Sequence, residues 1–199
     1  GYQMVLRSAM AFDTIFAADS AGERAFEEAT KYIFQAMMES MSKKLEIRLF
    51  YGQMGLAAID SVLGNVITIK TSEWAPGIWA GAENMRLEIY SSAGVLKGDC
   101  KVSSVSFENK TVTVDSLPAG VVATDVIFEF GSYGKEMAGL HKIITNTGSI
   151  FGISASQYAL WKGNEHGVGG AITFSSLAKG LAKPVEKGLE TDVVIFVNP

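Results

Sequence analysis

The chain has 199 residues, of which 48% are hydrophobic and 19% charged, and its formal net charge is −4 at pH 7. This length can bury the core of one domain or of two small ones. A nucleic-acid-binding domain normally carries a basic face, so the negative charge and the lack of a Lys/Arg run longer than Lys43-Lys44 argue against that class. Because about a quarter of an average soluble chain is charged, the low charged share indicates either a Gly- and Ala-rich core or an apolar assembly interface.

Further classes are excluded by what the sequence lacks. Cys100 is the only cysteine, so no internal disulfide and no cysteine-based metal site can form, which fits synthesis in a reducing compartment. No apolar stretch reaches the roughly 18 residues of a membrane-spanning helix. The N-terminus resembles no signal peptide and does not start with Met, and we therefore expect a processed or cloned fragment.

A long amphipathic helix is the first predicted element. Ser20 and Glu23 form a capping-box pattern, and Gly52 is a suitable residue to end the helix about 30 residues later. Between them, apolar residues recur every three or four positions and predict one buried face: Phe26, Ala29, Ile33, Met37, Met41, Leu45 and Leu49. A helix of this length, roughly 45 Å, needs a partner along its whole apolar face.

Short β-type segments follow the helix. Residues 53–65 are rich in Gly and Ala and are interpreted as a connector, after which the hydrophobic period changes to two. The predicted strands cover residues 66–70, 85–90, 101–107, 111–115 and 125–130. Residues 108–110 form a credible hairpin loop, and Trp74 and Trp79 lie in a loop that we expect to cover one end of the β-unit. This density of strands predicts a small antiparallel sandwich or barrel.

The last third of the chain is predicted to mix helices and a strand. A second capping-box pattern at Ser154 predicts a short helix over residues 154–161. Another helix is expected over 175–182, ended by Pro184. Residues 193–197 predict a strand that is too apolar to be solvated on both faces.

No residue pattern in the chain is arranged for catalysis. Cys100 stands in no nucleophile motif and is expected to fill space in a strand. Glu165-His166 has neither the spacing nor the second histidine of a metal site. The Gly-rich segments 52–55 and 167–170 lack the pattern of a phosphate-binding loop. We therefore expect a protein that is not an enzyme and that uses neither a cofactor nor a metal.

Several segments together resemble the major capsid (coat) proteins of tailed bacteriophages. The helix that closes on Leu49-Phe50-Tyr51-Gly52 looks like the spine helix of that family, which often ends in a Leu-rich Tyr-Gly turn. The other similar segments are Phe26-Glu27-Glu28-Ala29-Thr30, Met37-Met38-Glu39-Ser40, Asn146-Thr147-Gly148, Phe151-Gly152-Ile153, Trp161-Lys162-Gly163-Asn164, Gly188-Leu189 and Val193-Val194-Ile195-Phe196-Val197-Asn198-Pro199. The resemblance covers roughly residues 1–55 and 132–199.

The resemblance implies an α+β, coat-protein-like fold with three parts. Residues 1–55 would hold an N-terminal segment and the spine helix, and residues 132–199 a peripheral α/β segment. Residues 66–131 would form a small antiparallel β-sandwich or barrel inserted between them. The chain departs from the family because no axial domain follows Pro199 and the N-terminal arm is reduced to residues 1–19, so the resemblance implies a fragment.

The function that the resemblance implies is structural: a subunit of an icosahedral bacteriophage or prophage capsid, made in the bacterial host cytoplasm and located in the virion. Such a shell assembles through repeated contacts between copies of one chain, with scaffold or portal proteins as further candidate partners and neither specific nucleic acid nor membrane. Charged residues of the spine are the candidate intersubunit contacts, although each can equally serve solubility alone: Glu23, Arg24, Glu27, Glu28 and Lys31. The alternative is a β-sandwich module that recognises a glycan or a protein through the aromatic loop 74–79.

Overall fold

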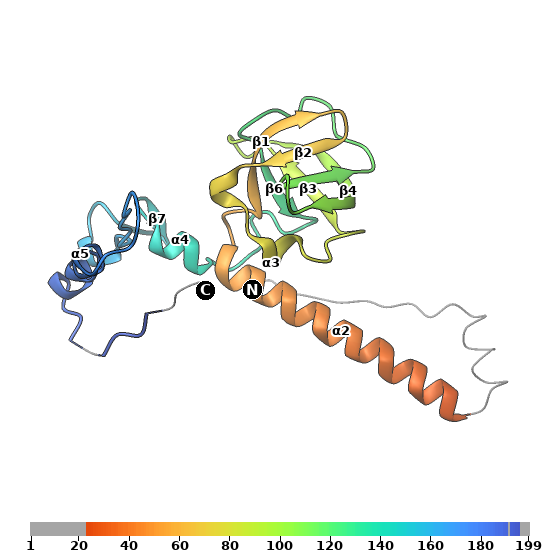
Figure 1. Ribbon diagram of the computed structural model, residues 1–199, viewed down its shortest axis with the longest axis horizontal. Coiled ribbons are helices and arrows are strands. Elements are labelled where there is room, and N and C mark those ends of the chain that lie inside the picture. Colours follow the sequence, from red (N-terminus) through yellow and green to blue (C-terminus); the bar gives the residue numbers. More distant parts are fainter. Residues whose placement is uncertain (1–22, 191, 196–199) are drawn as a thin grey trace. The chain divides into compact units, whose positions relative to one another are not determined.

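The structure of the protein, a computed structural model, describes residues 23–190 and 192–195 (Figure 1). Its helices and strands confirm the α+β class. The chain divides into two compact units between Gly139 and Leu140. The first unit contains a long helix and a β-barrel, and the second contains short helices and a two-stranded hairpin.

Helix α2 spans Glu23–Tyr51 and confirms the predicted long helix. The predicted N-cap residue, Ser20, lies outside the described residues. At the other end, the backbone N–H of Gly52 donates to the carbonyl of Arg48 at 2.9 Å and closes the last turn. A Cβ at Gly52 would collide with the carbonyl oxygen of Met137, so glycine lets the segment that leaves the barrel pass directly beside the end of α2.

Six antiparallel strands close into a barrel in the order β1-β2-β5-β4-β3-β6. Their bounds are β1 Ala57–Leu63, β2 Val66–Ile69, β3 Arg86–Tyr90, β4 Leu96–Ser106, β5 Thr111–Val114 and β6 Val126–Glu129. Strands β2 and β5 alternate half-buried and buried residues, as expected when one face of a sheet covers a core. The antiparallel pairing of β4 with β5 confirms the hairpin predicted around residues 108–110.

The connector predicted over residues 53–65 is wrong, because most of it is strand β1. This strand pairs with β2 on one side and, through Ala57 opposite Ile127, with β6 on the other, so it closes the barrel. Two features of strand β1 make it difficult to predict from the sequence. Alanine has a low preference for strands, and the register of β1 against β2 shifts between Ile59 and Ser61, which interrupts the period of two.

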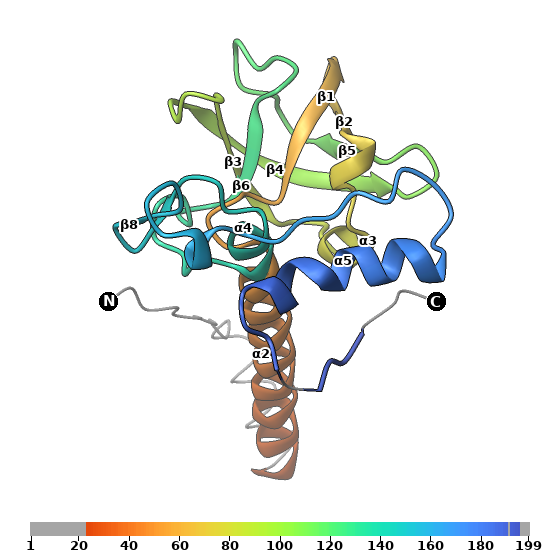
Figure 2. The same cartoon turned by 90° about the vertical axis from the view of Figure 1, so that its left-hand side faces the viewer.

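Aliphatic side chains fill the barrel, and an aromatic plug closes one end. The fully buried aliphatic residues of the strands are Ile59, Ile67, Ile69, Leu87, Ile89, Val102, Val112, Val114 and Ile127. Helix α3 (Pro76–Trp79) buries Trp79 completely, and Trp74 stacks on it with the ring centroids 6.1 Å apart. Figures 1 and 2 both show α3 at the end of the barrel from which α2 extends. The tryptophans therefore cover the barrel as expected, but Trp79 does so from α3 and Trp74 from the position directly after the 3-10 helix η1 (Thr71–Glu73).

The second unit contains α4 (Leu140–Ile144), the hairpin of β7 (Ser149–Ile150) and β8 (Ile153–Ser154), the 3-10 helix η2 (Ala159–Trp161) and α5 (Phe174–Glu186). The two central residues of the hairpin turn, Phe151 and Gly152, have φ of 55° and 76°, as a tight two-residue turn requires.

Three predictions for this part of the chain need correction. The helix over 154–161 is wrong: Ser154 ends strand β8, its hydroxyl accepts the N–H of Ser156 at 3.3 Å, and only η2 is helical. The helix over 175–182 is present as α5, but its capping box starts at Thr173 and it runs through Pro184 to Glu186.

The predicted strand over residues 193–197 is also absent where it can be checked. Residues 193–195 form no strand, and their side chains are exposed. The rest of that segment, Phe196 onward, lies outside the described residues.

Candidate assembly surface

The C-terminal part of α2 is fixed to the barrel by ion pairs. The carboxylate of Glu129, at the end of β6, pairs with Lys44 and with Arg48, whose Nη2 lies 3.3 Å from Glu129 Oε2. The Nε of Arg48 also lies 3.8 Å from Glu136 Oε1. The ammonium of Lys43 donates to the carbonyl of Ala80, just after α3. Because Arg48, Glu129 and Glu136 are largely withdrawn from water, the attraction between them is screened less than that of surface pairs.

The chain enters and leaves the barrel at one narrow neck. The backbone N–H of Gln53 donates to the carboxylate of Glu136 at 3.0 Å, and its side-chain amide donates to the Glu136 carbonyl at 2.8 Å. Next to it, the N–H of Gly139 donates to the carbonyl of Gly52 at 2.9 Å. A Cβ on Gly139 would lie 2.8 Å from the carbonyl oxygen of Phe50, so only glycine allows the two backbones this approach.

A hollow of about 470 Å³ lies between α2 and the barrel, but its cations are already engaged. Lys43 and Lys44 are bound to Ala80 and Glu129, as described above. Arg86 donates to Asp99 at 2.8 Å and lies over the ring of Phe130 at 3.7 Å. The hollow therefore offers an anion little positive charge that is not already neutralised.

The predicted buried face of α2 is largely exposed within this unit. The barrel contacts Ile47 and Tyr51, which lie on the side of the helix opposite Met41, Leu45 and Leu49, and it reaches no farther up α2 than about Ser40. On the predicted face, Ile33 and Met37 are half-buried, whereas Met41, Leu45 and Leu49 are 37%, 40% and 50% exposed. Nothing is described of the side chains of Phe26 and Ala29. The expected partner along the whole face is thus not supplied by the barrel.

Three residues of this face and two exposed neighbours form a continuous row of large apolar side chains, which we call the α2 stripe: Phe34, Met38, Met41, Leu45 and Leu49. Successive members are three or four residues apart. At 100° per residue, all five fall within a sector of about 80°. A row of exposed apolar side chains of this kind marks an interaction surface more often than a solvated one.

The predicted contact residues all lie in the first turns of α2. Glu27, Glu28 and Lys31 have exposed side chains, and nothing is described of the side chains of Glu23 and Arg24. The structure therefore places these residues at one end of the helix, away from the neck.

The residues considered for chemistry are not brought together. Cys100 is buried in β4, and burial, followed by the charges of Asp115 and Asp99, raises the pKa of its thiol to about 11. His141 lies in α4, and His166 packs beside Gly180 of α5. In the described part of the chain, no group of three His, Cys, Asp or Glu side chains is placed to hold a metal ion.

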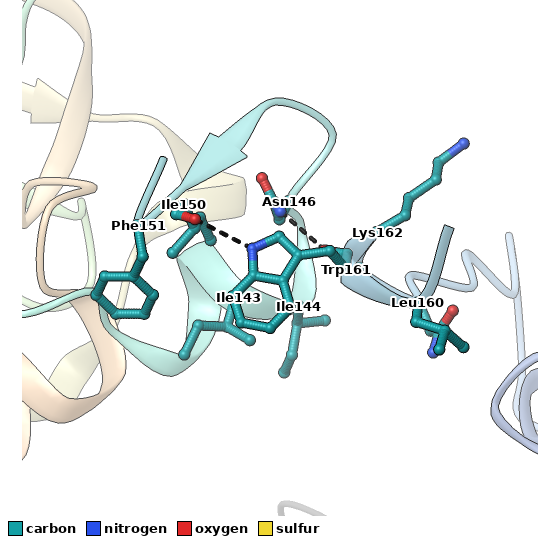
Figure 3. A pocket seen from close by; sticks show the side chains of 10 residues that line it. Ile143, Ile144, Asn146, Ile150, Phe151, Leu160, Trp161 and Lys162 are labelled. Atoms are coloured by element: carbon teal, nitrogen blue, oxygen red, sulfur yellow. Dashed lines mark hydrogen bonds between the residues drawn. The ribbon is translucent and has the colours of Figure 1, made fainter. Parts of the chain in front are cut away.

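The second unit has an apolar hollow of about 380 Å³, drawn in Figure 3. The indole Nε1 of Trp161 donates to the carbonyl of Ile150 at 3.1 Å, and the amide of Asn146 donates to the Trp161 carbonyl at 2.9 Å. The backbone at Gly163 packs directly against the carbonyl of Ile144. Only glycine fits there, because a Cβ would collide with that carbonyl. Aliphatic and aromatic side chains form most of the lining, so the hollow suits an apolar side chain and holds no acid–base machinery.

Sequence reasoning missed the charged groups that organise the first unit. The Nζ of Lys97 lies 2.7 Å from Asp125 Oδ2 and 2.6 Å from the carbonyl of Gly120, and the N–H of Val122 donates to the same carboxylate at 2.8 Å. Asp125 is only 2% exposed. Neither this pair nor the contacts of Glu129 follow a local spacing rule, because the partners are 28 and more than 80 residues apart in sequence.

No family model, curated protein or solved structure matches this chain. Among the described residues, no helix combines the length and the apolar character needed to cross a membrane.

Proposed function

We propose that this chain is a structural subunit of a bacteriophage or prophage capsid and that it builds an icosahedral shell through contacts with other copies of itself. In this proposal α2 is the spine helix, the barrel is an inserted domain, and residues 140–199 belong to the peripheral domain. Scaffold or portal proteins are further partners. The proposal starts from the coat-protein motifs of the sequence, such as the Leu49-Phe50-Tyr51-Gly52 ending of the helix.

The observation that carries the proposal is the neck between Gly52 and Gly139. An inserted domain requires that its entry and exit lie side by side. Here the N–H of Gly139 donates to the carbonyl of Gly52, and the N–H of Gln53 donates to the carboxylate of Glu136. The barrel closes on its own strands between these two points. A chain that passes from α2 directly to Leu140 would therefore be continuous without the barrel, which is the arrangement that the coat-protein resemblance calls for.

The α2 stripe and the charges beyond it support an assembling role rather than a catalytic one. A shell subunit must present both apolar and charged surface to its neighbours. The stripe supplies the apolar surface, and Glu27, Glu28 and Lys31 supply charges near the N-terminal end of the same helix.

The glycan-binding alternative receives less support. A sugar stacks on exposed aromatic rings, but Trp79 is fully buried, and Trp74 is packed against Trp79 and, edge-on, against Phe107. The segment 74–79 therefore offers little ring face to a ligand.

Light scattering across a concentration series tests the proposal. We expect the chain to form assemblies larger than a dimer as its concentration rises, and we expect the double charge reversal Glu27→Lys/Glu28→Lys to shift that transition to higher concentration. A matched control is Glu108→Lys, on the β4–β5 turn, which should leave the transition unchanged. A monodisperse monomer at millimolar concentration would argue against the shell.

A further inference from the structure

We propose that α2 binds the α2 of a second copy of this chain in antiparallel orientation through the α2 stripe. The inference deepens the proposed function, on which it rests, by naming one of the surfaces that the shell would use. The contact has two-fold symmetry, so each copy contributes the same residues to it.

The geometry of the stripe fits a helix better than a globular surface. A helix that covers a broad core usually presents an apolar sector of 100° or more, whereas the seam between two helices is narrower. The stripe spans about 80°, and from Phe34 to Leu49 it runs roughly 22 Å along the axis. Its first four members are spaced four, three and four residues apart, which is the spacing of a two-helix seam.

The barrel of the same unit cannot cover the stripe. Ile47 and Tyr51, which pack against the barrel core, lie about 120–160° around the helix from the centre of the stripe. Because Arg48 and Lys44 are also tied to Glu129, the helix cannot roll to bring the stripe onto the barrel without breaking those ion pairs.

The stripe is complementary to itself when the second helix runs in the opposite direction. Phe34 of one copy then meets Leu45 of the other, and Met38 meets Met41, so large side chains face each other in these four layers. Leu49 lies outside them, opposite Thr30. In an antiparallel pair, the residues that flank the stripe on one side of the first helix lie beside the residues that flank it on the same side of the second. On one such flank, Lys31 lies near the N-terminal end of the stripe and Glu46 near its C-terminal end. When Phe34 lies opposite Leu45 and Met38 opposite Met41, Lys31 of one copy and Glu46 of the other are about 3 Å apart along the helix axis. This separation is within reach of an ion pair.

The opposite, parallel orientation is less favourable. It would set the helix dipoles side by side in the same sense, and it would align Glu27 and Glu28 of one copy with the same acids of the other. The antiparallel orientation places these two acids toward the half of the partner helix that carries Lys43, Lys44 and Arg48.

Cross-linking of single-cysteine variants of the whole chain tests the proposal. Met41→Cys, near the two-fold axis, should give a covalent dimer with a short bifunctional maleimide. The control, Tyr32→Cys, is more accessible, with Tyr32 73% and Met41 37% exposed, but it lies on the far side of α2 and should not cross-link. The native Cys100 is buried, so the unmodified chain provides the baseline.

Charge exchange then tests the orientation. Lys31→Glu or Glu46→Lys alone should lower the cross-linked fraction of the Met41→Cys variant by roughly two- to tenfold at low salt, since each change places like charges together twice per dimer. The two changes combined should restore it. No cross-linking above the Tyr32→Cys control, or no recovery in the combined variant, would overturn the proposal.

The outcome is distinguishable from that of the proposed function. Large assemblies in light scattering without cross-linked α2 dimers would refute this contact and leave the shell in place. Cross-linked dimers that never grow into larger assemblies would support the contact and refute the shell.

Discussion

The carboxylate of Asp125 shows how one buried charge can organise a loop. The carboxylate accepts hydrogen bonds from the Lys97 ammonium and from the N–H of Val122. The backbone carbonyl of Asp125 accepts the N–H of Ile59 at 2.8 Å. These contacts tie the segment before β6 to β1 and to the start of β4. The buried Asp125 carboxylate therefore holds the loop before β6 in place, because little water can replace Lys97 and Val122 as its partners.

Replacing Asp125 should be costly. Asp125→Ala leaves the Lys97 ammonium with no carboxylate partner in a site where its side chain is only 20% exposed, so we expect the free energy of unfolding to fall by about 3–5 kcal/mol. Urea denaturation measures this change. The matched control is Asp99→Ala, which breaks the exposed pair with Arg86 and should cost about 1 kcal/mol or less. Equal costs for the two variants would contradict this account of the pair.

Cys100 gives the barrel a predictable dependence on alkaline pH. Its thiol pKa is raised from 9.0 to about 11 by burial and by neighbouring carboxylates. The unfolded chain therefore releases the proton near pH 9 and the folded chain only near pH 11. The stabilising contribution of the neutral thiol is complete below pH 9 and is lost between about pH 9 and 11.

Two measurements check this prediction. The thiol should react with a disulfide reagent slowly at pH 8 and at the full rate only after denaturation. Cys100→Ala should also remove part of the loss of stability between pH 9 and 11. Rapid labelling of the native protein at neutral pH would show that the thiol is neither buried nor protonated as described.

Helix α2 was predictable because its signals are local. The apolar spacing and the Gly52 ending are both local, and the structure confirms the helix and its end. The environment of its apolar face was not predictable, because a periodic pattern shows which residues share a face and says nothing of whether the same chain covers it. Strand β1 was missed for a similar reason: its partners β2 and β6 define it more than its own Ala-rich sequence does.

The exposed stripe predicts an unusual mutational pattern for α2. In dilute solution, Met41→Ala should change the free energy of unfolding by only about 0.5 kcal/mol, as at an ordinary surface site. Ile127→Ala, in the barrel core, should cost about 2–5 kcal/mol in the same assay. A cost of that size for Met41→Ala would mean that another part of the monomer covers the stripe.

The candidate assembly surface could be predicted only in part. The sequence places Glu27, Glu28 and Lys31 on α2, and the structure finds them exposed. The neck, by contrast, depends on Gln53 meeting Glu136 and on Gly52 meeting Gly139, contacts over more than 80 residues that no local pattern encodes. Gly52 was predictable as the end of the helix, but the need of Gly52 and Gly139 to admit a second backbone was not.

The closed barrel makes a sharp prediction about which piece of the chain can fold. Residues 55–131, expressed alone, contain all six strands and should give a β-type circular dichroism spectrum and a cooperative melt. Residues 66–131 lack β1, so β2 and β6 lose their common neighbour and this piece should fail to fold. A piece of roughly 75 residues is only marginally stable, so the comparison between the two pieces is more informative than either melt. Folding of the shorter piece would contradict the six-stranded closure.

The central claim is that copies of this chain assemble into a shell. Negative-stain electron microscopy after overexpression of the open reading frame that contains the chain tests it most directly. We predict closed shells, or the sheets and tubes that form when the same lateral contacts do not close. Particles that remain single and small at every protein concentration would contradict the account.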